Sequence, residues 1–309
     1  MSETNPVFKF DITIPCPICG CPLYKKVARR FDGGRLVCCK QCGHVYLNPI
    51  PDEAILRSYR DSSVYNPSNV DKWCTDPTGS YYYCLEFVKK NGGFTGKRVL
   101  DIGCGLGRFL FECREEGALV FGIDRDKENC RVAKLNYGLD IIPKSIEQVI
   151  QEGIFSTIRF DYIFCFEVIE HVKKPAELLR AAYEWLSPQG LLFLSTPNFS
   201  IYKKMKSASP FLKCYPQHIH YFTSDVLRGL LEKCGFEVLV MDYRGFFTPK
   251  QIKAIVFMHN NIIRKIWENI SKINIFYKLK DVLLESITPG SSWSESLEGQ
   301  DIVCIARKK

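Results

Sequence analysis

The chain has 309 residues, 46% of them hydrophobic and 25% charged, which is enough apolar sequence to bury one main α/β core with accessory segments. No apolar run reaches membrane-spanning length without a charged residue, and the N-terminal residues lack a signal-peptide pattern, so we expect a cytoplasmic protein. The net charge of +8 suits an acidic partner such as a nucleotide-sugar, RNA or an anionic membrane surface, and the fifteen cysteines suit reduced thiols or metal ligands rather than disulfides.

The first element in the chain is a pair of Cys-x-x-Cys motifs, each followed by glycine. The four expected ligands are Cys16, Cys19, Cys39 and Cys42. Four thiolates at this spacing bind zinc as a closed tetrahedron, which leaves no open position for chemistry. We expect a structural zinc ribbon over residues 1–48, because so short a segment needs the metal, which contributes about 10 to 16 kcal/mol in such peptides. Cys38 is an alternative to Cys39, and nucleic-acid or protein contact is an alternative role for the ribbon.

Residues 49–95 connect the ribbon to the core and carry several prolines and tyrosines. This composition predicts a linker followed by a helix that leads into the first core strand. Aromatic groups in this place can cover a bound cofactor, although an aromatic group beside a helix more often simply packs. We expect linker and lid helices here.

The most informative segment is an apolar strand that carries Asp101 and runs into three alternating glycines and then a helix. The glycines are Gly103, Gly105 and Gly107. Without a Cβ they let the backbone turn sharply and approach a ligand closely. A dinucleotide fingerprint has its third glycine one residue later, where this chain has Arg108. The next strand ends at Asp124, at the spacing needed to reach both hydroxyls of a ribose. The pattern therefore favours S-adenosylmethionine over NAD.

Strand and helix patterns then alternate toward the C-terminus, which predicts a doubly wound α/β domain over residues 96–309. The later strands are expected at 161–166, 191–195, 237–243 and 301–307, and the helices at 175–186 and 223–234. Thr223 is the expected N-cap of the second of these helices.

The connection over about 246–299 is too long for a hairpin and carries apolar residues at helical spacing with lysines and arginines among them. This pattern predicts a helical insertion before the last strand. It can cap the sheet edge or active site, form a dimer surface, or lie as a basic amphipathic helix on an anionic membrane.

Together these segments resemble the class I S-adenosylmethionine-dependent methyltransferases, in particular the group that includes the ubiquinone-pathway O-methyltransferases, over roughly residues 96–245 and the last strand. The resemblance implies a seven-stranded, mostly parallel, Rossmann-like sheet and a methyl-transfer reaction. The residues that would hold the cofactor are Asp101, Gly103, Gly105, Gly107, Asp124, Phe166 and Glu167.

Glu167, Glu170 and His171 follow the fourth strand, and on a first helical turn their spacing would align them on one face. This Glu-x-x-Glu-His resembles the metal-binding element of the ubiquinone-pathway O-methyltransferases and of the small-RNA 3′-terminal 2′-O-methyltransferases, both of which methylate one of two neighbouring hydroxyls. The resemblance implies Mg²⁺ or a similar ion on these three residues. The shell would be completed by Asn198, His218 or His220. In the alternative, Glu167 contacts cofactor or substrate while the other two pair locally.

His218 and His220 stand in the loop after the fifth strand, where class I enzymes build acceptor pockets. Either imidazole can take a hydroxyl proton, because its ordinary pKa is near neutrality. We expect catalytic roles for these two histidines and for Glu167. The expected acceptor is a hydroxyl of a glycan, nucleotide-sugar or secondary metabolite.

Two alternative functions follow from the same features. The ribbon, the positive charge and the Glu-x-x-Glu-His element also suit an RNA 2′-O-methyltransferase. A non-catalytic, cofactor-binding regulatory or scaffold subunit is the alternative from another class, although the intact glycine turn and acids argue against a dead site.

Overall fold

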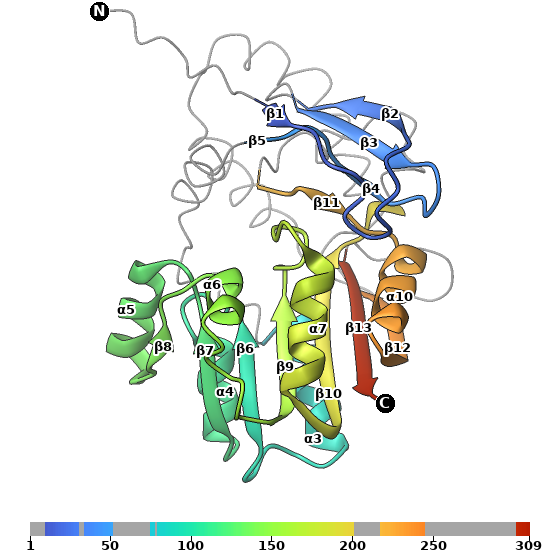
Figure 1. Cartoon of the computed structure of the whole chain (residues 1–309). Helices are drawn as coiled ribbons and strands as arrows, with labels where there is room; N and C mark the ends of the chain where they lie inside the picture. The colour runs from blue at the N-terminus through green and yellow to red at the C-terminus, as the bar shows by residue number, and fades with distance from the viewer. Residues whose placement is uncertain (1–9, 31–33, 52–74, 78, 201–216, 245–300) are drawn as a thin grey trace, which may run out of the picture.

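The computed structural model describes residues 10–30, 34–51, 75–77, 79–200, 217–244 and 301–309. Within these residues the chain forms a seven-stranded sheet, a four-stranded sheet and a two-stranded pair (Figure 1). No helix in the described part is both long enough and apolar enough to cross a membrane. The predicted insertion over about 246–299 lies outside the described residues, and so does the stretch 52–74 of the predicted linker.

The seven-stranded sheet has the order β12-β13-β10-β9-β6-β7-β8. Its strands are β6 (Arg98–Ile102), β7 (Leu119–Ile123), β8 (Ile141–Ile142), β9 (Phe160–Phe166), β10 (Leu186–Pro197), β12 (Phe236–Arg244) and β13 (Asp301–Lys308). Only β13 runs antiparallel to its neighbours in this sheet, which confirms the predicted mostly parallel arrangement. The chain runs outward from β6 through β7 to β8 and then returns to β9 on the other side of β6. Open α/β sheets bind ligands at the carboxyl ends of strands at such a reversal.

Helices cover both faces of this sheet, as doubly wound folds require (Figure 1). They are α3 (Ser80–Lys90), α4 (Arg108–Glu115), α5 (Lys127–Tyr137), α6 (Ile146–Gln151), α7 (Pro175–Trp185) and α10 (Ser224–Lys233). Buried residues of α6, α7 and α10 form one apolar cluster with one face of the sheet. Those of α3, α4 and α5 form a second cluster with the other face. The predicted Rossmann-like class is thereby confirmed.

Local sequence signals place several of these elements. The Thr223 hydroxyl accepts a hydrogen bond from the Val226 amide and caps α10, as predicted. Pro175 occupies the first turn of α7, where its missing N–H costs nothing. Strand β10 begins at Leu186, earlier than the predicted start at residue 191, because an irregular stretch already pairs with β9 there.

The N-terminal segment forms a separate small sheet above the carboxyl ends of the parallel strands (Figure 1). Its order is β11-β4-β3-β2, from β2 (Tyr24–Arg29), β3 (Arg35–Cys39), β4 (Val45–Leu47) and β11 (His220–Tyr221). A further pair joins β1 (Phe10–Ile12) to β5 (Ile50–Pro51). Strand β11 comes from the far part of the chain and pairs antiparallel with β4. The ribbon sheet therefore contains a strand from outside residues 1–48.

Candidate functional site

The turn between β6 and α4 lies at the point where the strand order reverses. Its three predicted glycines have positive φ angles of 76°, 53° and 79°. A Cβ on Gly103 would stand 2.4 Å from Cγ2 of Val168, and one on Gly107 would stand 2.9 Å from Cδ1 of Leu139. Both the left-handed backbone and the close packing therefore require glycine at these two positions.

Two acids face this turn from neighbouring strands. The Asp124 carboxylate accepts hydrogen bonds from the Gly105 amide at 2.8 Å and from the Asp126 amide at 2.8 Å. Burial raises the pKa of Asp124. Asp101 is almost fully buried, and burial together with the neighbouring Asp124 raises its pKa to about 8. Two buried carboxyls beside a glycine turn suit a nucleotide that presents hydroxyl donors and positive charge.

The end of β9 forms the neighbouring wall. Phe166 is buried there, with ring centroids 4.5 Å from Tyr81 and 5.1 Å from Phe109. The next residue, Glu167, has a φ of 55°, and its Oε1 accepts a hydrogen bond of 2.8 Å from the Ser195 hydroxyl. The predicted cofactor residues thus come from the ends of β6, β7 and β9, which meet at one edge of the sheet.

A second group lies beside this edge, where the ligand atoms of Glu170, His171 and His218 are all within 4.8 Å of one another. Oε1 of Glu170 is 3.8 Å from Nε2 of His171 and 4.0 Å from Nε2 of His218. Its other oxygen accepts a hydrogen bond from the Thr196 hydroxyl at 3.0 Å, while Oε1 is buried without a hydrogen-bond partner. Burial raises the pKa of Glu170 to about 8. A carboxylate oxygen that faces two imidazoles fits a divalent cation or a shared proton.

The structure corrects the predicted geometry of this group. Residues 167–171 form a turn, and α7 begins only at Pro175, so no helical face aligns the three predicted ligands. The left-handed φ of Glu167 interrupts a helix, and its carboxylate, which binds Ser195 and also contacts Glu170, is not one of the three mutually close ligands. His218, which the sequence offered only as a completing ligand, takes the third position.

The two predicted histidine bases occupy different environments. The ring of His218 stands beside His171, with centroids 4.7 Å apart. His220 is fully buried, where Nε2 donates to the Val172 carbonyl at 2.8 Å and Nδ1 lies 3.1 Å from Nε2 of His44. Burial lowers the pKa of His220 to about 4. Both of its ring nitrogens are engaged, which corrects its assignment as an acceptor-side base.

The four predicted knuckle cysteines gather at the tip of the ribbon, with all four sulfurs within 4.8 Å of one another. Cys16 and Cys42 are 3.5 Å apart between sulfurs, as are Cys19 and Cys39. The Cys38 thiol instead donates to the Gly43 carbonyl. Cys39, and not Cys38, therefore supplies the fourth sulfur of the group. The sulfur of Cys39 accepts from the Gln41 amide, as knuckle sulfurs do in zinc sites. This donor set fits zinc.

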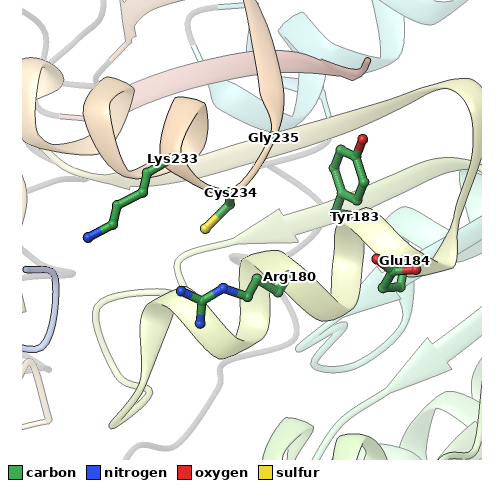
Figure 2. Close-up of a pocket in the computed structure, with 6 residues that line it drawn as sticks. All are labelled: Arg180, Tyr183, Glu184, Lys233, Cys234 and Gly235. Atoms are coloured by element: carbon green, nitrogen blue, oxygen red, sulfur yellow. The ribbon is translucent and has the colours of Figure 1, made fainter.

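A shallow cavity of about 360 Å³ lies elsewhere, between the C-terminal ends of α7 and α10 (Figure 2). It is lined by Arg180, Tyr183, Glu184, Lys233, Cys234 and Gly235. Since α7 ends directly before β10 begins, this cavity is at the amino-terminal edge of the parallel strands. It lies away from the glycine turn and the acids.

Sequence reasoning missed two parts of the site region. Strand β8 has only two residues, too few to show a period, yet its Ile142 carbonyl accepts from the Asp124 amide and brings it to the same edge. Arg30 and His44 of the ribbon were also missed as partners of the acceptor-side loop. No local signal marks them, because their contacts lie more than 170 residues away in the sequence.

Comparison with known proteins adds independent findings. A family described as a methyltransferase domain matches residues 79–240. The ubiquinone biosynthesis O-methyltransferase of Aeromonas salmonicida is 37% identical over 135 residues, 43% of this chain and 51% of that protein. Its counterpart in Actinobacillus pleuropneumoniae is 32% identical over 194 residues, 56% of this chain and 83% of that protein. The chain spans about half the length of several of the curated relatives it matches.

Solved structures share the fold. The plantazolicin methyltransferase BamL, in complex with a triazolic desmethylPZN analog and SAH, matches with a TM-score of 0.50 and 17% identity. The match covers 82% of this chain and 94% of that one. At this identity it shows the arrangement of strands and helices alone.

Proposed function

Because the chain belongs to the methyltransferase-domain family, we propose that it is an S-adenosylmethionine-dependent O-methyltransferase that acts on a hydroxyl of a small molecule or glycan. The observation that carries the proposal is the contact between the glycine turn and the segment that carries Glu170 and His171, where Val168 packs against Gly103. The printed names of the relatives support oxygen as the methylated atom.

The crevice at the ends of β6, β7 and β9 would hold the cofactor. When bound, S-adenosylmethionine supplies a methyl group that is already activated for transfer. Asp124 would accept hydrogen bonds from the ribose hydroxyls, and Asp101 would face the positively charged part of the ligand. The glycine turn allows close approach, while Phe166 and Glu167 close the side toward β9.

On the acceptor side, the protein must orient a hydroxyl and remove its proton. His218 is the proposed base, because its ring lies beside His171 and its Nε2 is 4.0 Å from Oε1 of Glu170. Glu167 is proposed to contact the acceptor or cofactor from the end of β9. Glu170 and His171 would hold Mg²⁺ or a similar ion, which lowers the pKa of a coordinated hydroxyl, while His218 would take the proton.

The four ribbon cysteines are proposed to hold a structural zinc ion. All four sulfurs are used in a closed site, so the metal would stabilise the ribbon rather than take part in the reaction. Membrane contact through the predicted insertion concerns residues that the structure does not describe.

The test is to incubate the purified chain with methyl-labelled S-adenosylmethionine and separated cell fractions, namely small molecules, glycans, RNA and proteins. We expect label in the small-molecule or glycan fraction. His218→Ala serves as the matched negative control, because it removes the proposed base and leaves the cofactor crevice unchanged. Label in RNA would support the 2′-O-methyltransferase alternative, and cofactor binding without any transfer would support a non-catalytic subunit.

A further inference from the structure

The ribbon shares a strand with the loop that carries the proposed base. In the antiparallel pairing of β4 with β11, Tyr46 lies opposite His220 and Val45 opposite Tyr221. At Ile219, the residue before His220, the backbone carbonyl accepts a hydrogen bond of 2.9 Å from the Leu47 amide. The acceptor-side loop is thus hydrogen-bonded into the ribbon sheet and not into the seven-stranded sheet.

The opposite side of the same loop is bound to the turn after β9. The amides of Ile219 and His220 both donate to the Glu170 carbonyl, at 2.9 Å and 3.1 Å. Nδ1 of His171 lies 3.1 Å from the Gln217 carbonyl. Residues 217–220 are therefore held between the ribbon and the Glu170 cluster, and a shift of the ribbon would move the loop relative to that cluster.

Arg30, directly after β2, makes the ribbon contact closest to the proposed base. Its side chain is nearly fully buried, with the residue 3% exposed. Nη1 donates to the His218 carbonyl at 2.8 Å and lies 3.5 Å from the Tyr221 hydroxyl. The guanidinium therefore binds the backbone of the residue whose ring faces Glu170, and a charged donor makes a stronger hydrogen bond than a neutral one.

His44 provides a second connection between the ribbon and the loop, at His220. Since Nε2 of His220 donates to the Val172 carbonyl, its Nδ1 accepts from Nε2 of His44. His44 follows the second cysteine knuckle directly, separated from Cys42 by one glycine. The ribbon thus contacts the loop at the proposed base through Arg30 and two residues further along the chain through His44.

We propose that the ribbon forms one wall of the acceptor site and that Arg30 is the positioning residue that sets His218 against Glu170. The inference rests on the proposed function, because it assigns the ribbon a part in the reaction attributed to that cluster. Apart from holding His218 in place, Arg30 takes no part in the chemistry. In this arrangement the ribbon is not a detachable contact module, since the acceptor-side loop is built on it.

Histidine NMR tests the positioning directly, because the chain has only five histidines and each imidazole gives a separate signal. The variants are Arg30→Ala, Arg30→Lys and the matched control Arg29→Ala, which removes the neighbouring exposed arginine at the end of β2. All are measured as zinc-loaded full-length chains with SAH bound, after metal analysis, and the His218 signal is assigned with His218→Gln.

We expect Arg30→Ala to shift or broaden the His218 signal and to lower the methyl-transfer rate constant by about ten- to a hundred-fold, with unchanged affinity for SAH. Arg30→Lys, which keeps a charged donor, should recover part of the rate, and Arg29→Ala should change neither quantity. An unmoved His218 signal in zinc-loaded Arg30→Ala would overturn the proposal. If that variant does not fold, Arg30→Gln is judged by the same two outcomes.

The readout separates this proposal from the proposed function, because the NMR signal needs no methyl acceptor. A displaced His218 signal in a chain that transfers no methyl group would overturn the function and keep the positioning. Normal transfer by Arg30→Ala with an unmoved His218 would overturn the positioning and keep the function.

Discussion

At the scale of single residues, the two acids of the proposed cofactor crevice are held differently. Asp124 accepts two short backbone hydrogen bonds, which lower its pKa against the larger raising effect of burial. Burial and, to a smaller extent, the nearby Asp124 together raise the pKa of Asp101 to about 8. Near neutral pH, Asp101 therefore holds its proton in the free protein, and a cationic ligand would favour its release.

Asp101→Asn should change both stability and binding. Between pH 4 and 8 the unfolded chain loses this proton while the folded chain, with the pKa raised from 3.8 to about 8, keeps it. The free energy of unfolding contributed by Asp101 therefore falls as pH rises through this window. We expect the variant to gain stability relative to wild type from pH 5 to pH 8 in urea titrations. Parallel stability curves would contradict this.

The same variant should bind S-adenosylmethionine about tenfold more weakly, because it loses a charged partner for the ligand. Calorimetry in buffers of different ionisation enthalpy should detect proton release on binding to wild type at pH 7 and none with the variant. Equal proton release by both would place the titrating group elsewhere.

His218→Ala and His220→Ala should separate chemistry from structure. Loss of the proposed base at residue 218 should lower single-turnover methyl transfer by about 10² to 10⁴ with little change in stability. The second variant leaves the His44 N–H and the Val172 carbonyl without partners, which should cost about 1 to 3 kcal/mol in urea unfolding. A stable but inactive His220→Ala would instead return that residue to the list of candidate bases.

Glu170→Gln should abolish divalent-cation binding, since Oε1 of Glu170 is the buried, unpartnered oxygen between the two imidazoles. Mn²⁺ titration followed by electron paramagnetic resonance measures this with the metal alone. Glu177→Gln is the control, because that carboxylate is exposed and pairs with Lys174. Retained Mn²⁺ binding in Glu170→Gln would remove the cluster as the cation site.

At the scale of elements, the turn between β6 and α4 is pressed against the turn after β9. The missing side chain of Gly103 makes room for Val168, so this glycine is needed for a tertiary contact as well as for its φ of 76°. Val168 lies between Glu167 and Glu170, and the cofactor turn and the acceptor cluster are therefore in contact through one residue pair.

Gly103→Ala should accordingly be far more damaging than a matched control. Gly153 also has a positive φ, of 65°, but a Cβ there would meet nothing within 4 Å. Gly153→Ala should cost only the left-handed strain of about 1 to 2 kcal/mol. Gly103→Ala should cost more and also weaken SAH binding, measured by urea unfolding and calorimetry. Equal costs would show that the turn can move away from Val168.

At the scale of the whole molecule, the ribbon and the methyltransferase domain share a core. Buried residues of the ribbon form one apolar cluster with residues that follow β10. The members of this cluster are Leu36, Val45, Leu47, Ile50, Phe199, Ile219 and Tyr221. Such a cluster couples the two parts in a way that a flexible linker would not.

Zinc removal should therefore loosen the acceptor-side loop as well as the ribbon. After treatment with a strong chelator, we expect faster hydrogen exchange at the Leu47 amide and at the Ile219 amide, which donates to Glu170. The amide of Cys165 in β9, inside the seven-stranded sheet, should stay protected. Protection of Ile219 after complete zinc loss would show that the loop is held without the ribbon.

Short-range patterns in the sequence determined those parts of this protein that depend on interactions between residues close together in the chain. Alternating glycines after an apolar strand, an acid at the end of the next strand and paired Cys-x-x-Cys motifs each act over a few residues, because backbone turns and metal spacing are local. From them the sequence predicted the doubly wound sheet and the grouping of the four cysteines.

The tertiary structure decided which side chains meet across long separations. Only packing brings His44 against His220, pairs a two-residue strand with the ribbon, and places His218 beside Glu170. An isolated pair of residues such as His220 and Tyr221 carries no period that could assign it to a sheet. His220 is buried, whereas His218 is partly exposed. This difference in burial is also a property of the folded chain, because the solvent is excluded by neighbouring elements and not by adjacent residues.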